Sequence, residues 1–171
     1  SSPLAALIVD DPGARAVLHD AGRRGVAHLG VPGSGALDSE EAALANRLLG
    51  NGADAPVIEQ LLGGLRFRLT DSRWVAATGA RSVVEVAGRA YPDRTAVWVP
   101  AGAPVRVRDV AGGVRCYLAV SGGFAAPTVL GSVSTDELAH LGPGPLSAGQ
   151  AVAVAGHGHA PALSDAVGVS R

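Results

Sequence analysis

The chain of 171 residues contains no methionine and no lysine, and its 14 basic side chains are all arginine. Several chemistries depend on a lysine amine, among them the Walker A phosphate loop, the Schiff base, and the covalent attachment of biotin or lipoate. The sequence therefore excludes each of these from this chain.

Cysteine is nearly absent as well, since Cys116 stands alone. An intrachain disulfide is thus impossible, and we expect a reducing compartment and a cytoplasmic location. Cys116 lies in a strand-like run between Arg115 and Tyr117, so we interpret it as a core residue, with a nucleophile as the alternative.

Strong charge and long apolar helices are also missing. The net charge is −1, which gives no reason to expect nucleic acid or a membrane surface as a partner. The apolar run Leu4–Val9 is too short for a signal peptide, and acidic residues follow it directly. Cys116–Thr135 carries no charge, but its glycines and Pro127 indicate strand and turn, not a membrane span. With 47% apolar and 17% charged residues, we expect a globular chain of one domain, or of one domain and a small extra piece.

One convincing helix follows a Gly/Pro-rich loop that begins at Gly30. We expect this helix at about Ser39–Leu49, with Asp38 as its N-cap and Glu41 completing a capping box. An apolar stripe recurs at helical spacing, and Gly50-Asn51 is typical of a left-handed C-terminal cap. The loop before the helix either forms a structural turn or holds an anion at the helix N-terminus.

The rest of the sequence is rich in strands and turns, and the spacing favours an all-β barrel or sandwich. Gly63-Gly64 predicts a hairpin between two of the strands. The expected strands are Leu4–Val9, a short strand that enters a turn within Arg15–Arg24, Val57–Leu62, Leu65–Leu69, Arg73–Ala77, Ser82–Val86, Ala96–Val99, Val105–Val110, Val114–Val120 and Ala151–Val154. Val26–Val31 leads into the loop before the helix.

Only a few residues suggest chemistry, and each has a structural alternative. Glu59 lies in an apolar run and is either a buried anchor or an acid–base group. Arg115 and Tyr117 share a strand face, where they either meet a substrate or form a surface stripe. Asp20 beside Arg23 either braces a turn or orients a substrate acid. No nucleophilic triad and no metal site is predicted, because His157 and His159 have no third ligand nearby.

The order of local motifs resembles one family closely. They are Pro12-Gly13, His19–Gly25, Gly30–Asp38, Ala45–Asn51, Val57–Glu59, Thr78–Ala80, Arg115–Gly123 and Leu130–Thr135. This order is similar to that of the carboxyltransferase-domain proteins with a cyclophilin-like fold. They include the C subunit of bacterial 5-oxoprolinase, the carboxyltransferase region of urea carboxylase, and proteins labelled allophanate hydrolase subunit 2.

The resemblance implies a mainly β, cyclophilin-like barrel over residues 1–155, with 156–171 as a loose tail or the start of a missing second half. It implies a subunit of an enzyme that opens 5-oxoproline with ATP or carboxylates a urea-like substrate from carboxybiotin. The partner would be a related chain, similar to the 5-oxoprolinase B subunit or to allophanate hydrolase subunit 1. No cofactor is expected on this chain; ATP or carboxybiotin would come through other subunits. A regulatory module, like the family's antagonist of a kinase inhibitor, is the alternative.

The same resemblance suggests the site. Glu59, Asp20 and Tyr117 are the expected catalytic residues. Ser34, Asp38, Arg115 and Arg23 are the expected substrate-binding residues. Three departures from the family bear on this assignment: Ala16–Asp20 replaces a Thr-Thr-Val-Gln-Asp pattern, Gly144-Pro145 and Gly149-Gln150 differ from the usual pairs, and members normally continue into a second half.

Overall fold

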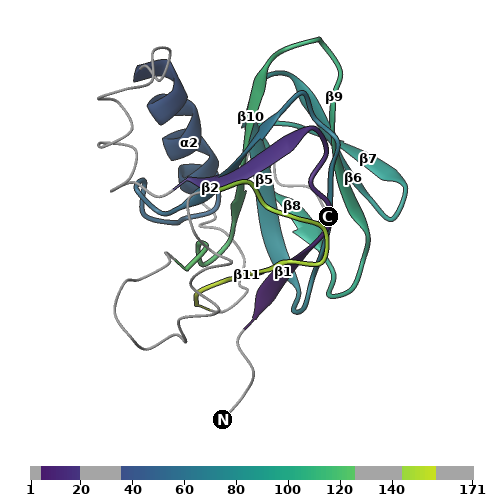
Figure 1. The fold of residues 1–171 in the computed structure, drawn as a ribbon. Helices are drawn as coiled ribbons and strands as arrows, with labels where there is room; N and C mark the ends of the chain where they lie inside the picture. Colours follow the sequence, from purple (N-terminus) through teal and green to yellow (C-terminus); the bar gives the residue numbers. More distant parts are fainter. Residues whose placement is uncertain (1–4, 20–35, 126–143, 157–171) are drawn as a thin grey trace.

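A computed structural model describes residues 5–19, 36–125 and 144–156 of the chain. These residues form two antiparallel β-sheets and one helix, α2, which covers the outer face of one sheet (Figure 1). The strands are β1 (Ala6–Asp11), β2 (Arg15–His19), β3 (Val57–Leu61), β4 (Leu65–Leu69), β5 (Arg73–Gly79), β6 (Ser82–Val86), β7 (Arg89–Pro92), β8 (Val97–Val99), β9 (Val105–Asp109), β10 (Arg115–Val120) and β11 (Ala151–Ala153). The expected class, mainly β with one principal helix, is confirmed.

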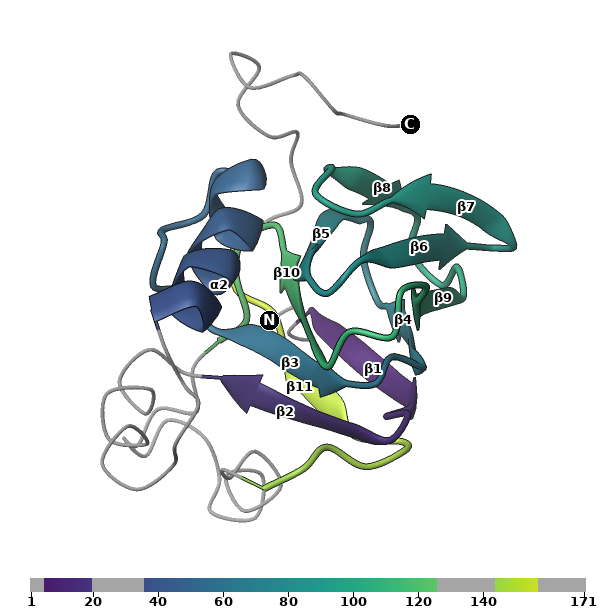
Figure 2. The ribbon, with the colours of Figure 1, turned by 90° about the horizontal axis from the view of Figure 1, so that it is seen from above.

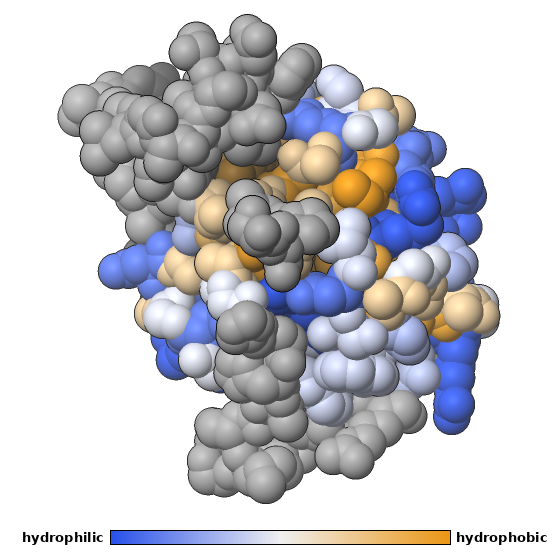
Figure 3. Space-filling model, turned by 90° about the horizontal axis from the view of Figure 1, so that it is seen from below, coloured by the Kyte–Doolittle hydropathy of each residue, from blue (hydrophilic) through white to orange (hydrophobic). Residues whose placement is uncertain are grey.

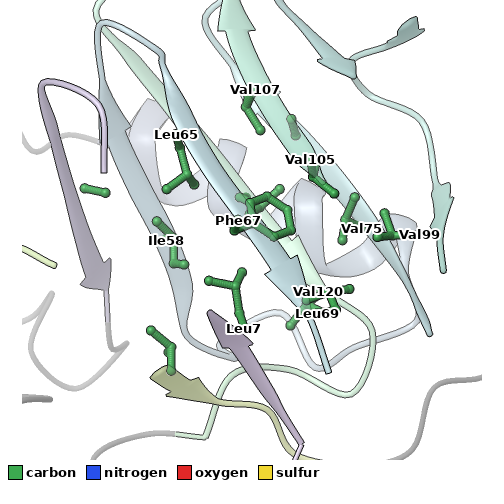
Figure 4. Packing of buried hydrophobic residues seen from close by; sticks show 14 of the residues in the cluster. Leu7, Ile58, Leu65, Phe67, Leu69, Val75, Val99, Val105, Val107 and Val120 are labelled. Atoms are coloured by element: carbon green, nitrogen blue, oxygen red, sulfur yellow. The ribbon is translucent and has the colours of Figure 1, made fainter. Parts of the chain in front are cut away.

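The strand order separates the molecule into two layers. One sheet has the order β11-β1-β4-β9-β6-β7, and the other has the order β2-β3-β10-β5-β8. The main core lies between them, where alternating residues of both sheets meet around Phe67, Ile58 and Val75 (Figure 4). The expectation of a closed barrel is wrong for the described residues, because their strand pairing leaves both sheets open.

A second, smaller core lies on the other side of the β2-β3-β10-β5-β8 sheet. Ala42 and Ala45 of α2, and Leu49 directly after it, pack there against Trp74 and Tyr117. Figure 2 shows the helix lying against this sheet. This is the apolar stripe that the helical spacing predicts. The sheet is thus buried on both faces where the helix covers it.

Helix α2 runs from Ala36 to Leu48 and so begins before the predicted start. Asp38 therefore lies in the first turn, and the prediction that it is the N-cap is wrong. Ala36 and Leu37 are both good helix formers, which explains why the helix extends through them. Glu41 does not complete a capping box; its carboxylate accepts the backbone N–H of Gly79 at 3.0 Å and pairs with Arg94.

The helix C-terminus confirms its predicted cap. Gly50 has φ +76°, and the N–H of Asn51 donates to the carbonyl of Asn46 at 2.9 Å. The N–H of Gly50 donates to the carbonyl of Arg47 at 3.1 Å. These two hydrogen bonds form a Schellman motif.

Gly63-Gly64 does not form the predicted hairpin. The two glycines have φ values of +72° and +94°, but they carry the chain from β3 in one sheet to β4 in the other. Alternation in a strand indicates which face is buried, and it carries no information on which sheet the strand joins.

The sequence analysis also missed β7, a short and mostly exposed strand. It forms a hairpin with β6 through Ala87 and Gly88, both at positive φ. The other predicted strands are present within the described residues, with ends shifted by a few positions. Val26–Val31 and the tail after Gly156 lie outside the described residues, and the proposed division at residues 155 and 156 stays a prediction.

The surface of the described residues is not uniformly polar. In the view from below, apolar residues gather toward the middle of the face, and hydrophilic residues lie toward its edges (Figure 3). This agrees with the large apolar share of the sequence, 47%. Among the described residues, no helix is long and apolar enough to span a membrane.

Candidate functional site

Polar side chains gather on the helix-covered face of the β2-β3-β10-β5-β8 sheet, where it extends past α2. Tyr117 of β10 lies directly opposite Glu59 of β3, and Val17 of β2 lies opposite Glu59 on its other side. Because side chains alternate along a strand, Arg115 and His19 project from the same face as Glu59. The predicted shared parity of Arg115 and Tyr117 is confirmed.

Glu59 is the centre of this group. Its Oε2 accepts the Tyr117 hydroxyl at 2.9 Å, and the same oxygen lies 4.0 Å from Nε of Arg115. Its Oε1 lies 3.5 Å from Nε2 of His19, which makes an ion pair when the imidazole is protonated. The Glu59 side chain is 14% exposed, so the sequence-based expectation of a partly buried carboxylate is confirmed.

Two opposing effects set the pKa of Glu59. Burial raises it, because desolvation disfavours the charged form, while the contacts with His19, Tyr117 and Arg115 lower it. Together the three partners outweigh burial, and the pKa lies below the ordinary glutamate value. Glu59 is therefore a carboxylate at neutral pH and a weak proton acceptor.

His19 is the member of this group that the sequence analysis did not single out. It ends β2 and lies edge-on to the ring of Tyr117, with the ring centroids 6.4 Å apart. Its position depends on the register between β2 and β3, which pairs His19 with Val57. In the sequence, the signal for His19 was its position two residues after Val17 in an alternating strand. Only the register between β2 and β3 brings His19 close to Glu59.

The first turns of α2 lie next to this group. Thr78 is the cross-strand partner of Tyr117, and its hydroxyl donates to the carbonyl of Glu41 at 2.6 Å. The Glu41 carboxylate accepts the N–H of Gly79 and pairs with the guanidinium of Arg94, whose φ is +55°. The helix is thus fixed to the end of β5 beside Tyr117.

Gly79 is required by this close packing. Its φ is +93°, and a Cβ at this position would lie 2.7 Å from the carbonyl oxygen of Arg115 and 3.2 Å from Cδ2 of Tyr117. Any side chain would push against the strand that carries both residues. The glycine therefore lets the two strands and the Tyr117 ring approach one another.

The structure brings together three of the predicted site residues: Glu59, Tyr117 and Arg115. Asp38 lies in the first turn of α2, and Asp20, Arg23 and Ser34 lie outside the described residues. Their predicted roles stay predictions.

Cys116 is buried in the core, and burial raises the pKa of its thiol to about 11. This value is unsuited to a nucleophile at neutral pH, in agreement with the interpretation of Cys116 as a core residue. Within residues 5–19, 36–125 and 144–156, no group of His, Cys, Asp and Glu side chains is arranged to hold a metal ion.

Comparison with known proteins gives consistent matches. The family described as "Carboxyltransferase domain, subdomain A and B" matches residues 29–167. The chain is 38% identical to the C subunit of 5-oxoprolinase from Escherichia coli over 125 residues, which cover 70% of this chain and 38% of that protein. It is 35% identical to urea amidolyase of Saccharomyces cerevisiae over 132 residues, or 77% of this chain and 7% of the yeast protein.

Solved structures agree with these matches. The crystal structure of TTHA0988 superposes with a TM-score of 0.73 at 37% identity, and the match covers 94% of this chain and 33% of that one. This chain thus spans well under half the length of each of these relatives.

Proposed function

Since the chain belongs to the family of carboxyltransferase-domain proteins, subdomain A and B, we propose that it is a subunit of a multi-component enzyme acting on a small amide or lactam. The reaction is either ATP-dependent opening of 5-oxoproline to glutamate or transfer of a carboxyl group from carboxybiotin to a urea-like nitrogen. The observation that carries the proposal is the 38% identity to the 5-oxoprolinase C subunit over 70% of this chain.

The group around Glu59 supports this proposal through the chemistry that both reactions share. Each substrate presents a carbonyl oxygen and an amide-type nitrogen, and 5-oxoproline also carries a carboxylate. Arg115 supplies guanidinium donors suited to a carboxylate or a carbonyl. The Tyr117 hydroxyl donates a hydrogen bond to Glu59, and a phenolic oxygen is also the kind of acceptor that suits an N–H group of such a substrate.

Glu59 acts in this proposal mainly by orientation. Its low pKa keeps it charged, so it holds the Tyr117 hydroxyl and the Arg115 guanidinium in place. Tyr117 and Arg115 contact the substrate. Asp20 keeps the catalytic role, and Arg23, Ser34 and Asp38 keep the substrate-binding roles, that the family resemblance suggests.

The cofactors of the proposed enzyme are carried by other chains. A chain without lysine cannot bear covalently attached biotin, so carboxybiotin would be delivered by another subunit or domain. ATP would likewise be bound by a partner. The proposed partner is a related chain, similar to the 5-oxoprolinase B subunit.

Reconstitution tests this proposal. The full reading frame that contains this chain is purified with its partner subunits, and ATP turnover is measured with and without 5-oxoproline. Carboxyl transfer from carboxybiotin to urea is measured in parallel. We expect one substrate to stimulate turnover at least tenfold. If neither reaction occurs in a stable complex, the enzymatic proposal is wrong and a regulatory module becomes the better description.

A further inference from the structure

Large apolar side chains are rarely exposed in the described part of this protein, and the three exceptions lie on two neighbouring connections. Leu62 is 64% exposed and follows β3, while Val110 and Val114, 49% and 61% exposed, lie between β9 and β10. We call these three residues the apolar turn patch. The two connections lie side by side (Figure 2).

Backbone contacts hold the two connections together. The N–H of Leu62 donates to the carbonyl of Val114 at 2.9 Å. Next along the chain, Gly63 packs so closely on Asp109 that a Cβ there would lie 2.7 Å from the Asp109 nitrogen. The N–H of Val110 donates to the carbonyl of Arg81 at 3.1 Å. The patch is therefore a built surface on firmly packed turns.

Leu62 is placed at a cost in conformational energy. Its φ is +64°, in the left-handed region that bulky side chains rarely adopt. Glycine would fit this position without strain, as it does at Gly63 and Gly64, where φ is also positive. An exposed leucine in a strained turn gains nothing from core burial, so folding alone does not account for it.

The charges around the patch are mainly positive. Arg15 and Arg115 lie on either side of Leu61 in the sheet, and Arg81 adjoins Val110. Asp109 is also close, but its Oδ1 accepts the N–H groups of Ala111 and Gly112 and so serves the turn. An occupant that matches this surface would present apolar side chains with carboxylates beside them.

We propose that the apolar turn patch is the docking surface for the partner subunit, which presents an apolar contact flanked by carboxylates. This inference rests on the proposed function, because it assigns the patch to the partner of that enzyme. Arg115 borders the patch and also lies 4.0 Å from Glu59. A partner docked on the patch would thus reach the edge of the candidate site.

Matched glycine substitutions test this proposal. Leu62→Gly removes the apolar side chain and relieves the positive φ, while Ala87→Gly relieves a positive φ of +50° in the exposed β6–β7 turn, outside the patch. We expect neither to lower the melting temperature. We expect Leu62→Gly, and independently Val114→Thr, to weaken binding of the purified partner at least tenfold in titration calorimetry. Ala87→Gly leaves the affinity unchanged.

The charged rim has its own test. Arg15→Glu should lower the affinity further and reduce its dependence on salt concentration.

Each outcome separates this proposal from the proposed function, because affinity and turnover are measured apart. Equal affinity of the wild type and the Leu62→Gly and Val114→Thr variants overturns the docking surface, whatever the turnover. It is also overturned if the wild type binds no partner, or if light scattering shows that Leu62→Gly only disrupts a dimer of this chain. A complex that is weakened by these substitutions, but that turns over neither substrate, supports the surface and contradicts the proposed function.

Discussion

At the scale of single residues, the arrangement around Glu59 shows how a buried carboxylate is kept charged. Desolvation would neutralise it, but a phenol, an imidazole and a guanidinium all lie within 4.0 Å of its oxygens. Tyr117 and Arg115 are fixed in turn by β10, whose neighbour β5 ends at Gly79. The charge of Glu59 and the close packing at Gly79 therefore constrain the same two residues, Tyr117 and Arg115.

The lowered pKa of Glu59 makes a prediction about stability and pH. The group binds its proton less readily in the folded than in the unfolded chain, so its contribution is present above the unfolded pKa and is lost as pH falls through the folded one. We expect Glu59→Gln to lower the free energy of unfolding by about 1 to 2 kcal/mol at pH 7. The difference from wild type should shrink below about pH 4.

Urea unfolding of both proteins across this pH range measures the effect. The control is Glu40→Gln, on the exposed face of α2, which should change stability by less than about 0.5 kcal/mol at each pH. A Glu59→Gln difference that stays constant from pH 7 to pH 3, or that grows on acidification, contradicts the assigned pKa direction.

At the scale of elements, α2 is held by hydrogen bonds near both of its ends. Near its start, Glu41 and Thr78 connect it to β5. At its end, the buried side chain of Asn46 donates to the carbonyls of Ala53 and Ala55. The helix thus has a fixed position next to Tyr117.

The prediction at this scale concerns the hydrogen bonds of the Asn46 side chain. Its Oδ1 also accepts Nδ2 of Asn51 at 3.1 Å, and Asn51 in turn bonds to the carbonyl of Val120. Asn46→Ala leaves these buried groups without partners, so we expect a loss of about 2 to 4 kcal/mol. Arg47→Ala, at the exposed neighbouring position, should cost less than about 0.5 kcal/mol in the same denaturant titration. Similar costs for both variants would contradict the described network.

Most elements could be predicted from the sequence, because their signals are local. Buried and exposed residues alternate strictly along Leu65–Leu69, and Gly50 follows the end of the helix. Each of these signals is contained within a few residues of the sequence. The assignment of β3 and β4 to different sheets and the contact of His19 with Glu59 depend on pairing between distant segments. Period and propensity do not specify such pairing, and so the placement of β3 and β4 in different sheets and one member of the site were missed.

At the scale of the whole molecule, one buried arginine connects three distant segments. The Arg73 side chain is 0% exposed and binds Asp71 with Nε and Nη2. It also donates to the carbonyls of Ser121, Ala155 and Gly156. Arg73 therefore joins the start of β5 to the segments that follow β10 and β11.

Replacement of Arg73 should be among the most costly single changes. Arg73→Met leaves the bound carbonyls and Asp71 without their donor, and we expect a loss of about 3 to 5 kcal/mol. Arg73→Lys should recover little of this, because an ammonium cannot reproduce the planar set of donors. Thermal and urea unfolding measure both, with exposed Arg66→Lys as the control. A loss below about 1 kcal/mol for Arg73→Met would contradict this role.

We propose that the group held by Glu59 on the helix-covered sheet is the substrate site of a multi-subunit amide- or lactam-processing enzyme. The most direct test is substrate-dependent turnover of the reconstituted complex that carries Tyr117→Phe, with Tyr91→Phe on β7 as the matched control. We expect at least a tenfold loss of turnover for Tyr117→Phe, with the complex intact, and wild-type turnover for Tyr91→Phe. Wild-type turnover by Tyr117→Phe would contradict it.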